Sequence, residues 1–413
     1  MDFPIDRVRA AFPALSLADD GRPRVYFDNP AGTQVPGPVI ARMIETLRDK
    51  NANLGGYFTT TRAAAALLNQ ARRACATFYH AASPREIVFG QNMTSLTLHM
   101  SRCLGRDWKA GDEIVLTRME HDANVSPWLL LAEDKGLKVR WIDFNPDTYE
   151  FADDAIDGVL SERTRLVALG YASNCTGTIN DVAGMAKKAR AAGALTYVDA
   201  VQLAPHCAID VQALACDFLV SSAYKWFGPH QGILWGREEV LERTFAYKLR
   251  PAGASLPDKF ETGTQSHEGI AGCLGALEYL SGLGGGAEGA VERQAIVRAF
   301  DLCAAYEQAL GSRLIEGLRQ FKGLTVRGIT SANAMHRRVP TVSFTLEGHH
   351  PQAMAKALAA ENIFVWSGHN YAIEPINRMG LMDQGGVLRA GLAHYNTAAE
   401  VDGFLTALRS ITR

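Results

Sequence analysis

One lysine in this sequence stands where it could act as a nucleophile. Lys225 lies in SSAYKWFGPHQG, residues 221–232, directly after DFLV, a short apolar run that predicts a buried strand. Its neighbours in sequence are small or aromatic rather than charged. Apolar surroundings lower the proton affinity of an amine, and a neutral amine can form a Schiff base with a carbonyl group. We therefore expect chemistry at Lys225, although most lysines at strand ends are simply solvated.

A carboxylate occupies a matching position on the preceding strand-like run. ALTYVDA, residues 194–200, is apolar and carries Asp199 near its end. In open α/β sheets the ligands bind beyond the carboxyl ends of the strands, where Asp199 and Lys225 would meet. The cofactor that needs both an amine and a carboxylate is pyridoxal phosphate (PLP), whose aldehyde binds the lysine and whose pyridine nitrogen pairs with the acid. The simpler alternative for Asp199 is a helix N-cap.

Three further stretches place polar side chains at the same predicted edge. Thr94 and Ser95, in GQNMTSLTLHM, lie where a strand ends and a helix can begin, a position that binds phosphate. His121, in MEHDANVSPW, could stack on an aromatic ring, and Asn174, in YASNCTGTIN, could hydrogen-bond a phenolic oxygen. Each also has an ordinary interpretation, as a helix cap, a polar loop residue or a turn-forming asparagine.

The elements that position these residues alternate along the chain. Short β-branched, apolar segments predict strands over residues 85–90, 111–117, 137–144, 164–173, 194–200 and 217–223. Helix-like stretches such as residues 182–193 separate them, which is typical of a mostly parallel sheet with helices on both faces. From about residue 270 helical patterns dominate, with a strand predicted at TVSFTL. We expect an N-terminal segment (1–20) packed on a small domain, a large domain (21–280) and a small C-terminal α+β domain (281–413).

Composition narrows the function classes. The 413 residues include 42 basic and 44 acidic side chains, a formal net charge of -2 that gives no electrostatic case for nucleic acid or an anionic membrane. The seven cysteines form no CxxC pair, so we expect reduced thiols and no metal site. The N-terminus lacks a signal-peptide layout and no apolar run is long enough for a membrane span. A cytoplasmic protein is predicted.

Taken together, several stretches resemble the class-V aminotransferase family of fold-type I PLP enzymes, most closely its cysteine desulfurase and selenocysteine lyase branch. The stretches are YFDNPAGTQVP, GDEIVLTRMEHDANVSPW, SNCTGTIN, VDAVQ, DFLVSSAYKWFGP, FETGTQ and LRAGLAHYNT. The resemblance runs nearly end to end. It implies an α/β fold whose large domain holds a mostly parallel seven-stranded sheet between helices, with a smaller α+β C-terminal domain. It also implies a homodimer with shared active sites.

The resemblance assigns roles by position. Lys225 matches the Schiff-base lysine, Asp199 the partner of the pyridine nitrogen and His121 the ring-stacking histidine, and these three are the expected catalytic residues. The other implied cofactor contacts are Asn174 and Gln202 at the phenolic oxygen and Thr94, Ser95, Ser222, Tyr224 and, from the neighbouring subunit, Thr264 at the phosphate. Arg389 matches the arginine that holds the substrate carboxylate, and Asn29 is a further expected substrate contact.

One departure from the family pattern bears directly on the chemistry. Tyr371, in SGHNYAIEP, stands where the related desulfurases carry the cysteine that attacks the substrate sulfur, and no cysteine follows Cys303. A tyrosine cannot accept sulfur to form a persulfide. Cys175 is the one thiol predicted near the cofactor, and a small packing residue is the simpler interpretation of it.

Two other departures concern the pocket. Tyr224 replaces the histidine that usually precedes the lysine, and a phenol can still donate a hydrogen bond to phosphate. The segment NANLGGYFTTTR, residues 51–62, is neutral before its final arginine where the family usually has a basic, histidine-containing motif. Residues 51–62 are therefore expected to shape a different substrate pocket.

These observations predict a homodimeric PLP enzyme that acts on a small amino acid, as a C–S or other β-lyase without a persulfide step. A class-V aminotransferase or an epimerase uses the same residues and remains an alternative. A protein of another class, a non-catalytic PLP-binding sensor or scaffold, is disfavoured because Lys225, Asp199 and Arg389 are all present.

Overall fold

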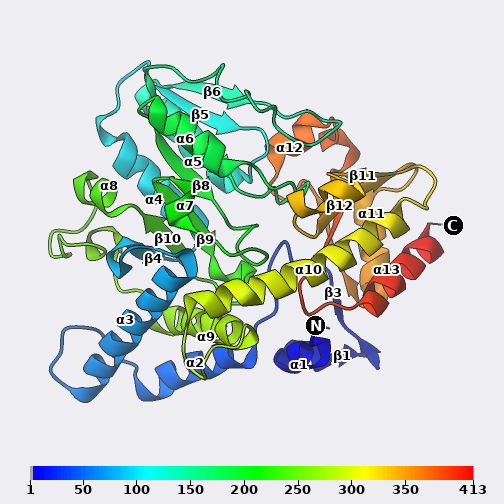
Figure 1. Cartoon of the computed structure of the whole chain (residues 1–413), viewed down its shortest axis with the longest axis horizontal. Helices are drawn as coiled ribbons and strands as arrows, with labels where there is room; N and C mark the ends of the chain where they lie inside the picture. Colours follow the sequence, from blue (N-terminus) through cyan, green and yellow to red (C-terminus); the bar gives the residue numbers. More distant parts are fainter. Residues whose placement is uncertain (1–2, 413) are drawn as a thin grey trace.

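A seven-stranded sheet forms the centre of the larger part of the molecule (Figure 1). The computed structural model describes residues 3–412. The strands, in spatial order, are β4 (Ile87–Gly90), β10 (Gly232–Gly236), β9 (Phe218–Ser222), β8 (Leu195–Asp199), β7 (Thr164–Gly170), β5 (Glu113–Thr117) and β6 (Lys138–Ile142). All neighbours from β9 to β6 are parallel, whereas β10 runs antiparallel to both β4 and β9. The predicted α/β class with a mostly parallel sheet is confirmed.

The sheet is buried on both faces because its strands are apolar at successive positions. Val167 and Val198 belong to one hydrophobic cluster, while their neighbours Leu166 and Tyr197 belong to another. Successive side chains of a strand point to opposite faces, so the two clusters lie on the two sides of the sheet. Covering both faces are the helices α3 (Thr59–Tyr79), α4 (Met93–Leu104), α5 (Ser126–Lys135), α6 (Val182–Ala191), α7 (Val211–Leu214), α8 (Glu238–Arg243) and α9 (His267–Leu283).

A second, antiparallel sheet forms the C-terminal unit. Its strands, in spatial order, are β11 (Leu324–Arg327), β12 (Thr341–Leu346), β15 (Val387–Gly391) and β14 (Trp366–Gly368). The helices α10 (Arg293–Leu318), α11 (Pro351–Ala360) and α13 (Ala398–Ile411) share a hydrophobic cluster with this sheet. Before β15, the short helix α12 (Ile373–Arg378) lies on the side of this unit nearest β5 and β6 in Figure 1.

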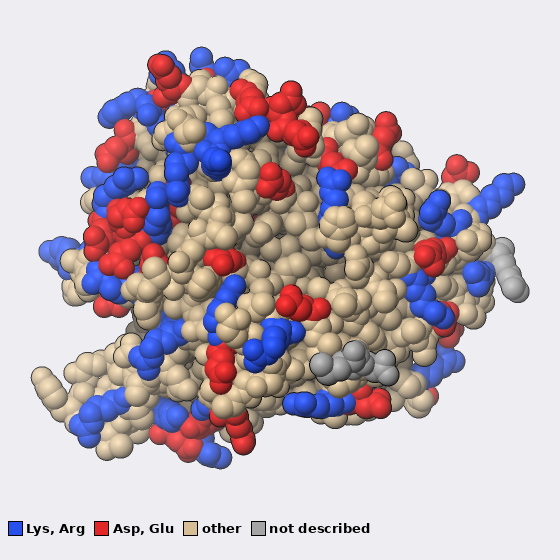
Figure 2. Space-filling view, in the orientation of Figure 1, with Lys and Arg blue, Asp and Glu red and all other residues tan. Residues whose placement is uncertain are grey.

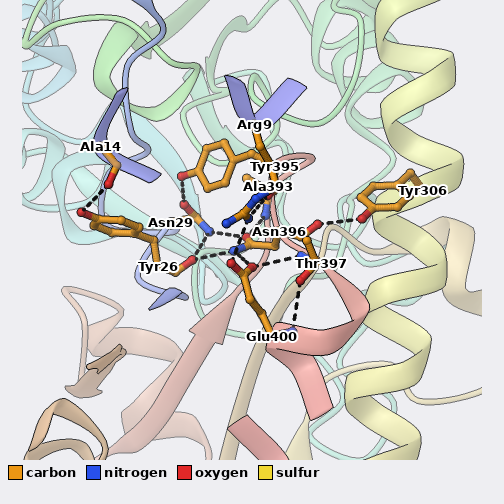
Figure 3. A network of polar contacts seen from close by, with 10 residues as sticks. All are labelled: Arg9, Ala14, Tyr26, Asn29, Tyr306, Ala393, Tyr395, Asn396, Thr397 and Glu400. Atoms are coloured by element: carbon orange, nitrogen blue, oxygen red, sulfur yellow. Dashed lines mark hydrogen bonds and ion pairs between the residues drawn. The ribbon is translucent and has the colours of Figure 1, made fainter. Parts of the chain in front are cut away.

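Residues 3–49, called the N-terminal segment from here on, extend beyond the expected 1–20 segment and contact the C-terminal unit. The segment contains α1 (Ile5–Ala10), the hairpin β1 (Ala18–Asp19) and β2 (Arg22–Pro23), β3 (Val25–Tyr26) and, further on, α2 (Gly37–Asp49). Arg9 pairs with Glu400 of α13 at 2.9 Å, as Figure 3 shows. β3 pairs in parallel with β13 (Ile363–Phe364). The expected boundary between segments at residue 21 stays a prediction, since β3 also lies against the C-terminal unit.

The sequence pattern located six of the seven central strands. The strand it did not place is β10, GILWG, which has a glycine at each end and only three residues that favour a strand. The run expected over 164–173 ends as a strand at Gly170, and the chain turns after it. Among the helices of residues 3–412, none combines the length and the apolarity needed to cross a membrane. Basic and acidic side chains are interspersed on the face shown in Figure 2.

Candidate active site

The carboxyl ends of the parallel strands surround one cavity. Register pairs Asp199 at the end of β8 with Gly170 on β7 and with Val220 on β9, so the loops that follow these strands converge. Eight of the predicted cofactor side chains line this cavity: Thr94, His121, Asn174, Asp199, Gln202, Ser222, Tyr224 and Lys225. The sheet therefore brings together residues that lie far apart in the sequence, as the position of ligand sites in such folds predicts.

Lys225 sits in a single helical turn, Ala223–Lys225, directly after β9. Its side chain is buried, and burial, reinforced by the charge of Arg389, lowers the pKa of its amine to about 7. Nζ donates a hydrogen bond to the backbone oxygen of Pro30, which holds the amine at the cavity. A large fraction of this amine is thus neutral near neutral pH, and a neutral amine is the nucleophilic and basic form.

Asp199 faces the same cavity from the neighbouring strand. One carboxylate oxygen accepts a hydrogen bond from the Val201 backbone N–H at 2.8 Å, and the other has no hydrogen bond from residues 3–412. Burial raises the pKa of Asp199 to about 6, and the charge of Lys225 opposes that rise. A carboxylate with one free oxygen in a buried cavity suits a cationic N–H donor such as a protonated ring nitrogen.

His121 follows β5 and is held in one orientation. Its Nδ1 accepts a hydrogen bond from the Ala123 backbone N–H at 3.0 Å, so in the neutral ring the proton lies on Nε2. Burial, together with the charges of Lys225 and Arg389, lowers the pKa of His121 to about 3. A neutral, flat and fixed imidazole is suited to stacking on an aromatic ring rather than to acting as a positively charged group.

Glu120 is a cavity residue that the sequence did not reveal. Its carboxylate accepts hydrogen bonds from the Gly170 backbone N–H and from the side chains of Thr117 and Asn124, at 2.6, 2.6 and 2.9 Å. Burial raises the pKa of Glu120 to about 7. The residue joins the end of β5 to the end of β7, beside His121. Nothing in MEHDAN distinguishes it from a solvated acid, because its burial and its backbone donor, Gly170, depend on another strand.

The two predicted amides each present an oxygen without a partner. Asn174 donates from Nδ2 to the backbone oxygen of Asn370 at 2.8 Å, and Gln202 donates from Nε2 to the Thr341 hydroxyl at 2.9 Å. The amide oxygens, Oδ1 of Asn174 and Oε1 of Gln202, are buried and accept no hydrogen bond from the described residues. Two buried polar groups with unused capacity in one cavity indicate a polar ligand there.

The predicted phosphate contacts divide into three groups. Thr94, at the N-terminus of α4, Ser222 and Tyr224 line the cavity. The Ser222 hydroxyl accepts a hydrogen bond from the Met93 backbone N–H at 2.9 Å. Ser95 does not line the cavity, since its hydroxyl and backbone N–H both bind the capping residue Asn92. Thr264 lies in a separate groove, which is compatible with a role in another subunit's site.

The two predicted substrate contacts differ. Arg389, on β15, is buried, donates to the backbone oxygen of Asn174 at 2.9 Å and leaves Nε without a partner among the described residues. Burial lowers its pKa to about 10, so it stays charged at neutral pH. Neither Arg389 nor Asn29 lines the cavity that contains Lys225, but only Arg389 keeps an unused donor.

Instead, Asn29 belongs to the polar network of Figure 3, where Nδ2 donates to the Tyr26 backbone oxygen and to Asn396, both at 3.0 Å. The same nitrogen also donates to the backbone oxygen of Gly391 at 2.8 Å. Oδ1 of Asn29 accepts from Tyr395. The expected substrate contact from Asn29 is therefore corrected to a link between the N-terminal segment and the C-terminal unit. The sequence motif placed this residue near the site without indicating that its amide is fully used.

The cavity has no reactive thiol from either of the two residues considered above, since Tyr371 carries a phenol and the thiol of Cys175 is buried. Tyr371 lies beside His121, with ring centroids 5.5 Å apart and planes inclined by 20°. Cys175 is fully buried, and burial raises the pKa of its thiol to about 11. Because the thiolate is the nucleophile, Cys175 is unsuited to attack a substrate. The simpler prediction, that Cys175 packs in the core, agrees with its place in a hydrophobic cluster.

The donor set fits the cofactor that the sequence indicated. A neutral amine, a buried carboxylate with a free oxygen, a flat imidazole and two amides with unused oxygens surround the cavity. A helix N-terminus with hydroxyl groups beside it provides for a phosphate. These are the groups that PLP requires.

Comparison with known proteins gives a consistent result. The family described as aminotransferase class-V matches residues 25–404. A cysteine desulfurase of Pectobacterium carotovorum is 34% identical, with 100% of this chain and 99% of that protein aligned. The apo structure of a cysteine desulfurase from Thermococcus onnurineus NA1 superposes with a TM-score of 0.88 at 28% identity, over 99% of this chain and 98% of that one. The cysteine desulfurase CsdA of Escherichia coli, in an S-sulfonic acid form, gives 0.85 at 26% identity, over 100% and 99%.

Proposed function

Since this chain belongs to the class-V aminotransferase family and is a PLP-dependent, cysteine desulfurase-like enzyme, we propose that it cleaves the C–S bond of a small amino acid without a persulfide relay. The observation that carries the proposal is a contrast within one site. Lys225 and Asp199 share the cavity, whereas Tyr371, at the position that the family resemblance gives to the sulfur-accepting cysteine, lies beside His121.

The residues at the strand ends prepare the α-carbon of the substrate. Bound PLP would act as an electron sink for the charge left when a proton leaves that carbon. Lys225 Nζ is the general base for this proton, because an amine with a pKa near 7 is matched to work at neutral pH. The Asp199 carboxylate would pair with the protonated ring nitrogen, and the neutral His121 would lie against the ring.

Arg389 orients the substrate. Its guanidinium is charged, buried and only partly used by the Asn174 backbone oxygen, so the remaining N–H groups can bind a carboxylate in a fork geometry. Fixing the carboxylate sets which bond at the α-carbon faces Lys225. This positioning role predicts a preference for α-amino acids over simple amines.

The step at the β-carbon needs no protein nucleophile in this proposal. Loss of the α-proton is followed by cleavage of the Cβ–S bond, with the bonding electron pair leaving on sulfur as a thiolate. One water molecule is then consumed, and the carbon skeleton of cysteine leaves as pyruvate and ammonium. Transfer of sulfur to a protein thiol would instead yield alanine and a persulfide. Cys175, buried and with a raised pKa, does not supply that thiol.

A product assay tests this proposal. Holoenzyme is mixed with L-cysteine and with S-substituted cysteines, and pyruvate, alanine, ammonia and free thiol or sulfide are measured together with the intact protein mass. We expect pyruvate and thiol in equal amounts and no sulfur added to the protein. Alanine with a persulfide on the protein would contradict the proposal, and conversion of the cofactor to its amine form would indicate transamination instead.

The same proposal includes a homodimer with shared sites. Large apolar side chains are strongly exposed in the single chain, among them Tyr57 (94%) and Leu249 (71%). Leu54 and Leu249 line a groove of about 1400 Å³ together with Thr264. A groove larger than ordinary small-molecule pockets, flanked by exposed apolar residues, suits a second copy of the chain. Thr264, which lies outside its own cavity, would reach the phosphate site of the partner.

Complementation between two variants tests the shared site. We expect Lys225→Ala to be inactive and Thr264→Ala to weaken PLP binding roughly tenfold, the loss of one charge-assisted hydrogen bond. In a mixed dimer one site carries both changes and the other carries neither. At a PLP concentration too low to load Thr264→Ala alone, activity should therefore recover when the two variants are co-refolded. A dimer by light scattering that shows no recovery would place Thr264 in its own subunit's site or in none.

A further inference from the structure

The segment that replaces the cysteine loop is tied to the cofactor site by its own backbone. Asp122, next to His121, donates its backbone N–H to the Tyr371 backbone oxygen at 2.8 Å. Asn174 donates Nδ2 to the Asn370 backbone oxygen at 2.8 Å. Asn174 and Asp122, the neighbour of His121, lie on different strand-end loops and thus contact two successive residues of one segment.

The backbone conformation of Asn370 and Tyr371 has a free-energy cost, which these hydrogen bonds offset. Asn370 and Tyr371 both adopt the left-handed backbone region, with φ of 51° and 57°. Residues other than glycine disfavour this region, and two in succession are unusual. The Tyr371 backbone N–H donates to His369 Nδ1 at 3.0 Å, and the Tyr371 ring stacks beside His121. Tyr371 does not line the cavity, and its side chain, 66% exposed, borders His121 at the cavity's edge.

The helix that follows anchors the segment to the large sheet. Ala372 is fully buried in a cluster with Cys175 and Ile376. On α12, Glu374 pairs with Arg118 and Arg378 pairs with Asp143 at 2.8 Å, and both partners belong to loops of the large sheet. Figure 1 shows α12 on the side of the C-terminal unit that faces β5 and β6. Residues 369–372 are therefore fixed at both ends.

We propose that residues 369–372 form a fixed wall that positions His121 and Asn174 against the cofactor, with Tyr371 as its positioning residue. This inference rests on the proposed function for the identity of the cofactor. In a wall, the His121 ring is supported by the stacked Tyr371 ring, and the Asn174 amide has one orientation, which leaves Oδ1 without a partner among the described residues. A mobile loop that carries a reactive group to the substrate would give neither residue a fixed orientation.

Three substitutions at one position separate the ring from the backbone. Tyr371→Phe keeps the ring and serves as the matched control. Tyr371→Gly removes the ring while accepting the left-handed backbone, and should weaken PLP binding roughly three- to tenfold, the range of one aromatic contact. Tyr371→Pro cannot adopt a positive φ, should displace both carbonyl contacts and should weaken binding by about tenfold or more. Asp20→Pro, at an exposed left-handed position in the β1–β2 hairpin, controls for a general backbone effect.

Two readouts report on position rather than on turnover. The first is the induced circular dichroism of the bound cofactor, which should fall in Tyr371→Gly and Tyr371→Pro and stay unchanged in Tyr371→Phe and Asp20→Pro. The second is hydrogen exchange of the Asp122 amide in the protein without cofactor, measured by mass spectrometry. We expect this amide to be protected in the wild type and in Asp20→Pro, and to exchange faster in Tyr371→Pro.

The outcomes distinguish failure of the wall from failure of the function. Reduction with borohydride followed by peptide mapping first establishes whether Lys225 of the wild type holds PLP. If it does not, the proposed function fails, and exchange at Asp122 still tests the wall. A folded Tyr371→Pro with wild-type PLP affinity and dichroism would overturn the wall. If that variant does not fold, rapid exchange of the Asp122 amide in the wild type would overturn it.

Discussion

The floor of the cavity and its rim are built in different ways. The floor, Asp199, Ser222 and Lys225, comes from two adjacent parallel strands whose pairing fixes where their ends lie. The rim, residues 369–372, arrives from the C-terminal unit and is held by contacts with two loops of the other unit. The floor keeps the residues of the family pattern, and the rim carries the departure at Tyr371. We therefore expect the cofactor chemistry to depend on the floor and the fate of the substrate to depend on the rim.

The largest expected effect comes from removing the amine of the floor. Lys225→Ala should lower activity roughly 10²–10⁴-fold, the range for loss of a positioned acid–base group, and should leave PLP bound without a covalent link. Activity and borohydride trapping measure the two effects separately. Lys259→Ala, a partly exposed lysine outside the cavity, is the matched control. If Lys225→Ala were as active as the wild type, the proposed role of Lys225 in the reaction would be wrong.

Asp199→Asn changes the charge of the floor while keeping its shape. We expect activity to fall roughly 10²–10³-fold, as for other groups that stabilise developing charge electrostatically. The backbone donor at Val201 can still bind the amide oxygen, so the fold should persist. Steady-state rates and far-UV circular dichroism report the two properties. A fold-intact variant with a normal rate would refute the assignment of the ring nitrogen to Asp199.

Arg389→Lys tests substrate orientation apart from the floor. The lysine keeps the charge but loses the fork, so KM should rise roughly 10–100-fold with a smaller change in kcat. PLP affinity should stay close to the wild-type value, since Arg389 does not line the cofactor cavity. A fall in kcat with unchanged KM would place Arg389 in the chemical step instead.

The lowered pKa of Lys225 predicts a pH dependence. Only the neutral amine adds to the cofactor aldehyde, and the neutral fraction rises with pH up to the pKa of about 7. The rate of PLP uptake by apoenzyme should therefore fall about tenfold for each pH unit below that value and level off above it. Stopped-flow absorbance measures this rate. A rate that keeps rising to pH 10 would mean that the amine has the ordinary lysine pKa.

Much of the floor could be predicted from the sequence because it depends on local signals. An apolar strand followed directly by Asp199 or Lys225 indicates both the element and the edge where the residue lies. Contacts made across the chain could not be predicted in this way. The sequence around Glu120 does not indicate that the Gly170 backbone N–H donates to its carboxylate. Nor does the sequence around Asn370 indicate that its backbone oxygen accepts a hydrogen bond from Asn174. Asn29 shows the same limit, since its motif indicated proximity and its amide partners lie near residue 395.

The smallest expected effect concerns Asn29 and tests its reassignment. Asn29→Ala leaves buried partners such as the Gly391 backbone oxygen and the Tyr395 hydroxyl without their hydrogen bonds. The free energy of unfolding should fall by about 1–3 kcal/mol, while KM should not change. Denaturant unfolding and steady-state kinetics separate the two. A raised KM with unchanged stability would restore Asn29 as a substrate contact.

The central claim is that the amine of the floor carries the cofactor while Asp199 faces its ring nitrogen. Borohydride reduction of wild-type holoenzyme, followed by proteolysis and mass spectrometry, tests it most directly. We predict a single phosphopyridoxyl group on the peptide that contains Lys225. An unmodified Lys225, or the group on another lysine, would contradict the account.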